Sequence, residues 1–340
     1  MVRMRYRHKV RLRKLGRFLL LALGALALVG ILVLVYADSL ITYDRGGAHL
    51  ATESGEMLQE EAGKPLPVIS DPVIEIQEET VAAIDIADTG GIYISAQMLK
   101  NVDKVTELIQ QREEPCAVMI DLKSDFGSFY YTSKYAKGNY ADGIDVKKVD
   151  ALLRTLEEQG YYMVASIPAF PDRAYVLEHD DLCIRVPGGY GWMDSRGIYW
   201  LDPSKDEVLS YLMELVRDLV DKGFREVCFT SFQFPKEGNY VYDSDLSRSD
   251  VLWEAAREIT KHFAKTDIVV SFRTAGTEFP SAGGRIYVFD IESSQIDPFA
   301  TAYGNSDAVR ELVFVVNSKD ARFERFAVMR PLMTESSHEE

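Results

Sequence analysis

The chain has 340 residues and a formal net charge of −15 at pH 7. Nucleic acids require a basic surface, so this excess of acid argues against a nucleic-acid partner. Its three cysteines lie far apart and its five histidines are scattered, so we expect buried free thiols, no disulfide framework, no metal site and no cofactor.

The chain begins with a basic segment followed by an apolar one. Residues 1–17 contain eight Lys and Arg and no acidic residue, and the apolar run Phe18–Tyr36 follows. As a helix this run spans about 28 Å, close to the hydrocarbon thickness of a bilayer. It predicts a single-pass transmembrane helix with the lipid bilayer as partner. The basic tail is then cytoplasmic and the C-terminal domain extracytoplasmic. A secretory signal peptide cleaved at Val35-Tyr36-Ala37 is the alternative.

Residues 37–84 are acidic and polar, and they contain several prolines and the pair Gly46-Gly47 without any helical or alternating period. This composition predicts a flexible acidic linker between the membrane and a folded domain. When the first 17 residues are set aside, the exported part carries about −23 formally. At the other end of the chain, residues 334–340 are expected to form a disordered tail.

Short apolar runs, most of them rich in β-branched residues, recur from residue 91 onward. Continuous rather than alternating apolar runs are typical of strands buried on both faces of a parallel sheet. The predicted strands are Gly91–Ser95, Ala117–Lys123, Tyr162–Ala169, Glu226–Phe232, Asp267–Phe272, Arg285–Ile291, Leu312–Ser318 and Arg325–Pro331.

Amphipathic segments lie between the early runs. Asp145 is the expected N-cap of a helix that places Val and Leu on one face, and Gly160 stands where a C′ glycine belongs. Ser204 and Glu207 predict a capping box at the start of the next helix. Two further helices are expected at residues 101–111 and 249–264. The helical pattern fades after residue 275, so the last connections are expected to be short or irregular.

The alternation of strands and helices predicts the α/β class and a single (β/α)8 TIM-like barrel over residues 85–333, behind the N-terminal transmembrane helix. A doubly wound open sheet is the competing architecture. The sequence has no glycine-rich nucleotide loop that would favour it.

In such a barrel, the chemistry lies at the carboxyl ends of the strands. Asp121 and Lys123 close the second predicted strand two residues apart, so both are expected on one face at the barrel mouth. They are either an internal ion pair that orders the top of the barrel or a pair that contacts a sugar together with Asp125.

The long loop after the third strand combines aromatic and charged residues, namely Trp192, Arg196, Tyr199, Trp200 and Asp202. Such residues suit a carbohydrate, and they equally suit a loop that folds back to close the barrel. Asp202-Pro203-Ser204 is also typical of a turn leading into the next helix.

Two further strand ends carry polar candidates. The fourth ends with Thr230, followed by Gln233, and neither side chain is a general acid near neutral pH. The sixth supplies Asp290 and Glu292, which are two residues apart and therefore expected on one face. Ordinary glycoside hydrolysis needs two carboxyl groups. The sequence offers one such pair of carboxyl groups, namely Asp121 with either Glu292 or Asp290.

Four segments carry recognisable motifs in a fixed order: Gly91–Ser95, Ile120–Gly127, Gly197–Pro203 and Glu226–Pro235. They resemble G-I-Y-V-[ST], I-D-[VL]-K-x-D-x-G, G-x-x-W-[VL]-D-P and E-[IV]-x-F-D-Y-[IV]-R-F-P. These motifs belong to the putative glycoside hydrolase domain family of bacterial TIM-barrel proteins. The resemblance implies a TIM barrel with a site at its mouth.

The chain also departs from the family pattern. Thr230 and Gln233 stand where the family has Asp and Arg, and Ser166 stands where the family usually has Arg in A-R-I-x-x-F-x-D. The resemblance therefore implies a barrel that has lost its acid–base residues. We expect a catalytically impaired, membrane-anchored pseudoenzyme that binds a glycan or a cell-envelope partner outside the cell. The alternatives are an active glycoside hydrolase and a structural spacer domain.

Overall fold

The computed structural model describes residues 41–44, 47–50, 90–274, 280, 282–304 and 308–333. The chain divides into two compact units, Met1–Glu78 and Glu79–Glu340. In the first unit, β1 (Ile41–Asp44) and β2 (Gly47–Leu50) form an antiparallel hairpin. The hairpin lies within the segment predicted to be a linker, and it was missed because four-residue strands leave little periodic signal.

The predicted transmembrane helix at Phe18–Tyr36, the basic tail, the cleavage alternative, most of the linker and the tail 334–340 lie outside the described residues. Within the part of the chain that the structure describes, no helix is long and apolar enough to cross a membrane.

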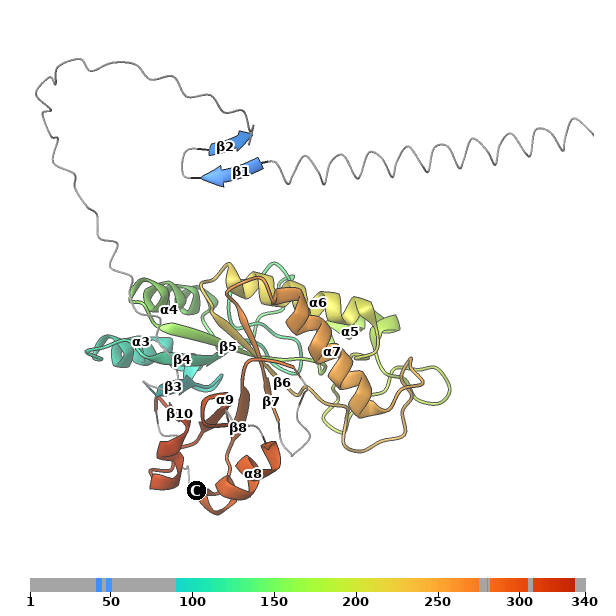
Figure 1. Cartoon of the computed structure of the whole chain (residues 1–340). Coiled ribbons are helices and arrows are strands. Elements are labelled where there is room, and N and C mark those ends of the chain that lie inside the picture. The colour runs from blue at the N-terminus through green and yellow to red at the C-terminus, as the bar shows by residue number, and fades with distance from the viewer. Residues whose placement is uncertain are drawn as a thin grey trace, which may run out of the picture. The chain divides into compact units, whose positions relative to one another are not determined.

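The second unit contains a closed barrel of parallel strands in the order β10-β3-β4-β5-β6-β7-β8-β9 (Figure 1). The pairing of β10 with β3 closes the ring and rules out the open sheet. Every predicted strand is confirmed. The strands are β3 (Gly91–Ile94), β4 (Ala117–Asp121), β5 (Tyr162–Pro168), β6 (Glu226–Thr230), β7 (Val269–Arg273), β8 (Ile286–Phe289), β9 (Leu312–Val315) and β10 (Ala327–Pro331).

Helices run between the strands around the outside of the barrel (Figure 1). The predicted helices are α3 (Val102–Gln110), α4 (Val146–Glu158), α6 (Asp206–Val220) and α7 (Arg248–Phe263). The short α5 (Arg173–Glu178) was not predicted. After β7 the helices are short, as expected: α8 (Ile296–Tyr303) and α9 (Ala308–Glu311). Single 3-10 turns are η1 (Met98–Asn101), η2 (Asp180–Leu182), η3 (Ser293–Gln295) and η4 (Ala321–Arg325).

One of the two predicted helix starts is correct. The Asp145 carboxylate accepts the backbone N–H of Lys148 at 3.2 Å, so Asp145 caps α4. The capping box at Ser204 is wrong, because α6 begins at Asp206 and the Ser204 hydroxyl donates to Asp202 at 2.6 Å. The Asp202 carboxylate also accepts the Ser204 backbone N–H at 3.0 Å, so Ser204 lies in a turn that precedes the helix.

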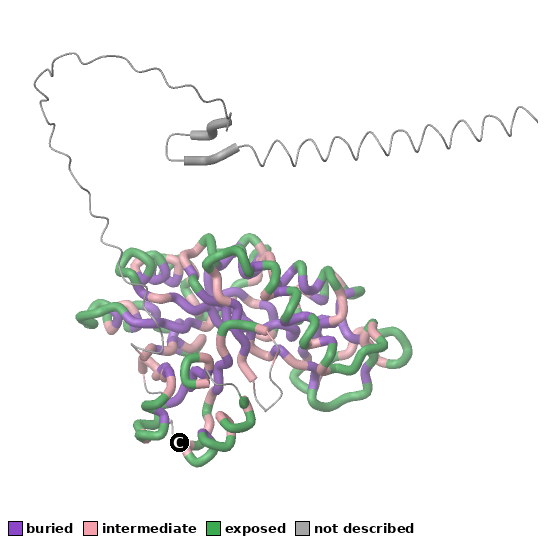
Figure 2. Tube along the Cα trace, viewed as in Figure 1, coloured by how far each residue is buried: buried purple, intermediate pink, exposed green. Residues whose placement is uncertain are grey.

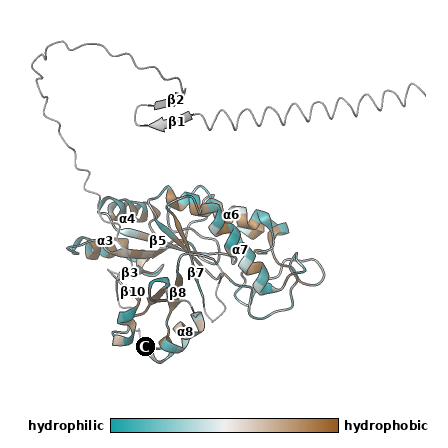
Figure 3. Cartoon of the chain, in the orientation of Figure 1, coloured by the Kyte–Doolittle hydropathy of each residue, from teal (hydrophilic) through white to brown (hydrophobic). Residues whose placement is uncertain are grey.

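Alternation along the strands separates two apolar layers. One side of each strand packs against the helices, where Ile92 and Ile94 belong to the large outer cluster. The other side fills the barrel, where Met119, Val164 and Met329 form the inner cluster. Figure 2 shows the buried residues concentrated along the strands, and Figure 3 shows helices with one apolar and one polar face. The two clusters therefore identify which side chains of each strand face the inside of the barrel.

A buried carboxylate closes the amino-terminal end of the barrel. Glu226, the first residue of β6, is fully buried and accepts hydrogen bonds from Tyr162 and Tyr287 at 3.0 Å each. Ser271 donates to it at 2.5 Å, and the Arg285 guanidinium pairs with it at 2.6 Å. With these four partners the buried charge is compensated. Glu226 is therefore a structural residue at the end opposite the mouth.

Candidate active site at the barrel mouth

The carboxyl ends of the strands bring one carboxylate and several donors together. Asp121 ends β4, and its Oδ2 accepts the Tyr93 hydroxyl at 2.7 Å and the Ala96 backbone N–H at 3.2 Å. Its Oδ1 accepts the Ser166 hydroxyl at 2.7 Å. Tyr93 comes from β3, and Ser166 lies beside Asp121 in the β4–β5 register. The predicted site residue Asp121 is thus held in place through both of its oxygens.

The surroundings of Asp121 change its acidity. Burial raises the pKa of the Asp121 carboxyl, and the hydrogen bonds from Tyr93 and Ser166 and the charge of Arg273 partly oppose this rise. Burial and the neighbouring Asp121 charge raise the pKa of Tyr93 strongly. Tyr93 therefore stays protonated and continues to donate to the carboxylate.

Two residues extend this group around the mouth. Arg273 ends β7, and its guanidinium lies 3.9 Å from the centroid of the Phe289 ring at the end of β8. The Phe289 ring meets the Tyr93 ring edge-on, with centroids 5.3 Å apart and planes at 87°. The mouth thus carries a continuous row, Arg273–Phe289–Tyr93–Asp121–Ser166.

Sequence reasoning missed most of this row. Arg273 lies one residue beyond the predicted strand Asp267–Phe272. Like Ser271 two residues earlier, it is at a position of β7 whose side chain faces the inside of the barrel. Extending the strand by one residue would have found it. Tyr93 belongs to the first motif, yet nothing in the sequence marks its hydroxyl as a partner of Asp121.

The structure corrects the expected pairing of Asp121 with Lys123. Lys123 Nζ instead contacts Asp172 Oδ2 at 2.6 Å, and both side chains are 1% exposed. Tyr211 donates to the same oxygen at 2.9 Å, and Asp172 Oδ1 accepts the Tyr175 backbone N–H. Since β4 ends at Asp121, strand alternation no longer governs where Lys123 lies. Lys123 is a buried structural residue rather than a ligand contact.

Gly127 completes this buried group. Its φ is +86°, and a Cβ there would lie 2.3 Å from Asp172 Oδ1 and 2.7 Å from the Ala174 side chain. No other residue fits so close to the carboxylate. Lys123, Gly127 and Asp172 therefore join the loop after β4 to the segment that begins α5.

The aromatic loop after β5 is mostly engaged in its own structure. Trp200 and Asp202 are 6% and 1% exposed. The Trp200 indole N–H donates to Asp194 at 3.3 Å, and Asp202 accepts the backbone N–H groups of Ser204 and Asp243 at 3.0 and 2.8 Å. These contacts show that the loop folds back, as the second alternative expected, and they agree with the turn predicted at Asp202.

The remaining candidates of that loop lie nearer the surface. Trp192 packs against Tyr240, with ring centroids 5.3 Å apart, and Tyr199 is partly buried. Arg196 pairs with Asp125 at 2.8 Å and with Asp194 at 3.0 Å. The structure thus brings the predicted residues Asp125 and Arg196 together as a bridge between two loops.

The last candidates follow strand ends. Thr230 ends β6 as a partly buried residue on the inward side, but Gln233 lies beyond the strand, after Ser231 at φ +51°. Asp290 follows β8 at φ +54°, and it and Glu292 are exposed. Because the strand ends at Phe289 and a left-handed residue follows, the alternation that was to place Asp290 and Glu292 on one face does not extend to them.

The described residues contain neither a cluster of metal-binding side chains nor a disulfide. No three His, Cys, Asp or Glu side chains of the described residues converge on a point that would hold a metal ion. Cys116, Cys183 and Cys228 are free and buried, as the sequence indicated.

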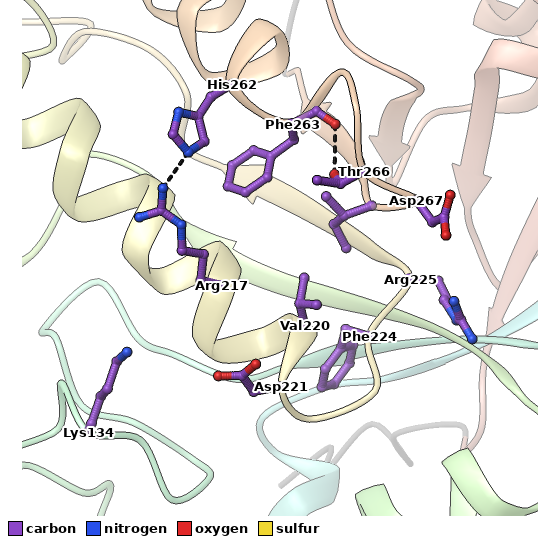
Figure 4. Close-up of a pocket in the computed structure, with 11 residues that line it drawn as sticks. Lys134, Arg217, Val220, Asp221, Phe224, Arg225, His262, Phe263, Thr266 and Asp267 are labelled. Carbon is purple, nitrogen blue, oxygen red and sulfur yellow. Dashed lines mark hydrogen bonds between the residues drawn. The ribbon is translucent and has the colours of Figure 1, made fainter. Parts of the chain in front are cut away.

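A cavity of about 520 Å³ lies on the outer wall of the barrel (Figure 4). Its lining comes from the carboxyl ends of α6 and α7, from the turns that lead into β6 and β7, and from Lys134 in the loop after β4. Arg217 points across it to His262, with 2.5 Å between the two nitrogens, and also contacts Glu214. The cavity is therefore at the amino ends of these strands, opposite the mouth, where barrel enzymes do not place their chemistry.

Comparison with known proteins gives a family and weak structural likenesses. The model of the family described as Putative glycosyl hydrolase domain matches residues 91–275, more than half of the chain. No curated protein matches the chain.

Three solved structures are among those similar to the chain. A hypothetical protein from Ruminiclostridium thermocellum is 20% identical, with 54% of this chain and 96% of that one covered and a TM-score of 0.46. The alpha-galactosidase from Lactobacillus brevis is 11% identical over 74% of this chain and 39% of its own, with a TM-score of 0.48. A GH36 alpha-galactosidase from Geobacillus stearothermophilus is 14% identical over 74% and 40%, with a TM-score of 0.47. The chain thus spans about two fifths of each galactosidase.

Proposed function

The chain belongs to the Putative glycosyl hydrolase domain family, and from that premise we propose that its barrel mouth binds a glycan without hydrolysing it at an appreciable rate. The observation that carries the proposal is the row at the mouth. It places the Asp121 carboxylate, two hydroxyl groups and the rings of Tyr93 and Phe289 side by side.

This combination matches the surface of a sugar. A pyranose ring offers hydroxyl groups around its edge and C–H groups on its faces. A carboxylate with free lone pairs accepts sugar hydroxyls, and partly buried aromatic rings pack against C–H faces. Because Tyr93 and Ser166 hold Asp121 in one orientation, little side-chain entropy is lost when a ligand binds.

The same geometry argues against efficient hydrolysis. Hydrolysis needs an acid and a second carboxylate about 5–9.5 Å apart. Thr230 takes the inward strand-four position where the family has Asp, and a threonine cannot supply the proton. Asp121 itself accepts three hydrogen bonds. We infer a barrel that retains recognition and has lost its acid–base residues.

We further propose that Phe18–Tyr36 anchors this barrel to the outside of the cell membrane, so that its glycan belongs to the cell envelope. The basic segment 1–17 and the uninterrupted apolar run support this orientation.

Glycan binding is tested with the full-length protein in mild detergent, first on a glycan array and then by titration calorimetry on each hit. Asp121→Asn keeps the shape of the side chain and removes its charge, so the affinity should fall about 10–100-fold. Asp103→Asn, on the exposed outer face of α3, is the matched control and should bind like the wild type. An unchanged affinity in Asp121→Asn, or no binding to any glycan, would refute the proposal.

One observation favours the second candidate, an active hydrolase. Burial raises the pKa of Asp121, which suits a proton donor, and the charge of Asp290 also acts on Tyr93. The test is product release from each bound glycan, followed by chromatography. Turnover that disappears in Asp121→Asn together with Asp290→Asn or Glu292→Gln would establish the hydrolase, whereas no turnover supports the binding role.

A further inference from the structure

Among the described residues, the Arg273 guanidinium at the barrel mouth has no counterion. It is partly buried and lies 3.9 Å from the Phe289 ring centroid. Within the described ranges it makes no ion pair and donates no hydrogen bond. At the other end of the barrel, Arg285 is neutralised by Glu226 at 2.6 Å. Arg285 is thus neutralised inside the barrel, whereas Arg273 pairs with no acidic side chain of the described residues and can take an external partner.

The contact with Phe289 leaves donors of Arg273 available. A ring face attracts the charge of the guanidinium as a whole, and one ring cannot accept from all five of its N–H groups. A group held in this way is oriented and still able to form two parallel hydrogen bonds. The group that best accepts two parallel hydrogen bonds from a guanidinium is a carboxylate or another planar anion.

Asp121 does not serve as that partner. Its two oxygens accept from Tyr93, Ser166 and the Ala96 N–H, which leaves about one lone pair for a sugar hydroxyl. Within the described residues no ion pair joins Asp121 to Arg273, which acts on it through space and opposes the rise of its pKa. A ligand in the mouth would therefore meet an acceptor at the Asp121 carboxylate. Across Phe289 it would meet the guanidinium N–H donors of Arg273.

We propose that Arg273 makes the mouth selective for acidic glycans, whose sugar carboxylate pairs with its guanidinium. The inference rests on the proposed function, since it names the class of glycan for the same site. The net charge of −15 repels polyanions at long range. Recognition of an acidic sugar thus depends on this short-range pair rather than on general attraction.

The test uses matched ligand pairs. Oligosaccharides of galacturonate, glucuronate and N-acetylneuraminate are each compared with the same oligosaccharide after reduction of its carboxyl groups. Titration calorimetry is done with the full-length protein in detergent. The wild type should bind at least one acidic form about tenfold or more tightly than its reduced counterpart.

Variants assign that preference to one side chain. Arg273→Gln should bring the ratio of the two affinities close to one while the reduced sugar still binds, and Arg273→Lys should keep part of the preference. Arg248→Gln is the matched control, because Arg248 also lies over a ring, Tyr240 at 4.5 Å, but at the start of α7. It should leave the ratio unchanged.

The outcomes separate this inference from the proposed function. If reduced or neutral glycans bind as well as the acidic ones, or if Arg273→Gln keeps the preference, the role of Arg273 is refuted and glycan binding stands. If no member of the panel and no glycan of the array binds, both are refuted. Thermal unfolding midpoints close to that of the wild type exclude misfolding of the variants as the cause.

Discussion

Breaking the buried pair Lys123–Asp172 should destabilise the barrel strongly. The two charged atoms are 2.6 Å apart, and both side chains are 1% exposed. Lys123→Met leaves Asp172 charged and buried, with only Tyr211 and the Tyr175 N–H as donors. We expect the free energy of unfolding to fall by about 3–5 kcal/mol, the usual cost of an uncompensated buried charge.

The double variant makes the reasoning sharper. Asp172→Asn alone leaves the Lys123 charge unpaired and should cost a similar amount. Lys123→Met with Asp172→Asn leaves no charge in the site, so its cost should be well below the sum of the two single costs. The assay is urea unfolding of the full-length protein at pH 7, followed by tryptophan fluorescence, because Trp200 is buried in the same domain.

A surface pair gives the control. Lys148 and Asp103 are 2.5 Å apart, but their side chains are 49% and 75% exposed. Lys148→Met should therefore cost less than about 1 kcal/mol. Equally small effects of Lys123→Met and Lys148→Met, or strictly additive costs in the double variant, would show that the Lys123–Asp172 site is not desolvated and that the reasoning is wrong.

Three further predictions concern Gly127, Asp121 and the N-terminal segment. Gly127→Ala should destabilise more than Gly138→Ala in the same urea assay, since both glycines have positive φ but only at Gly127 would the Cβ collide with Asp172. The raised pKa of Asp121 means that the native state holds more protons than the unfolded chain above the ordinary carboxyl pKa. The stability of the wild type relative to Asp121→Asn should therefore fall as the pH rises from about 4 through the raised pKa, and equal slopes would contradict this sign. Protease added to intact cells should remove the barrel and leave an anchored fragment containing residues 18–36; a protected domain, or a mature chain that starts after Ala37, would contradict the proposed topology.

The barrel was predictable because most of its strands are buried on both faces. Burial on both sides forces a continuous apolar run, and such a run is visible without any tertiary information, as at Ala117–Asp121 and Leu312–Val315. The side chains at the mouth leave no such trace. Arg273 became visible only when β7 proved one residue longer than its apolar run.

Long-range partners explain the errors at the site. Lys123 and Asp172 are 49 positions apart in the chain, and only the folding of two loops against α6 brings them together. Spacing along the sequence favoured the nearer carboxylate, Asp121, because alternation was assumed to continue past the end of β4. Local rules hold within a strand, but they do not apply to the loops in which most candidate residues lie.

The motif residues of this chain divide into two groups by what they contact. The first group is required by the fold itself. It consists of Lys123, Gly127 and Asp172, which hold two loops together, and of Glu226, which closes the amino-terminal end of the barrel. Asp121 faces the mouth, and the Thr230 side chain, within the described part of the chain, takes part in none of these networks. A change from aspartate at the Thr230 position therefore removes an acid without disturbing the scaffold. A scaffold that does not depend on the Thr230 side chain is the physical basis of our proposal that this barrel keeps its motifs without an acid at that position.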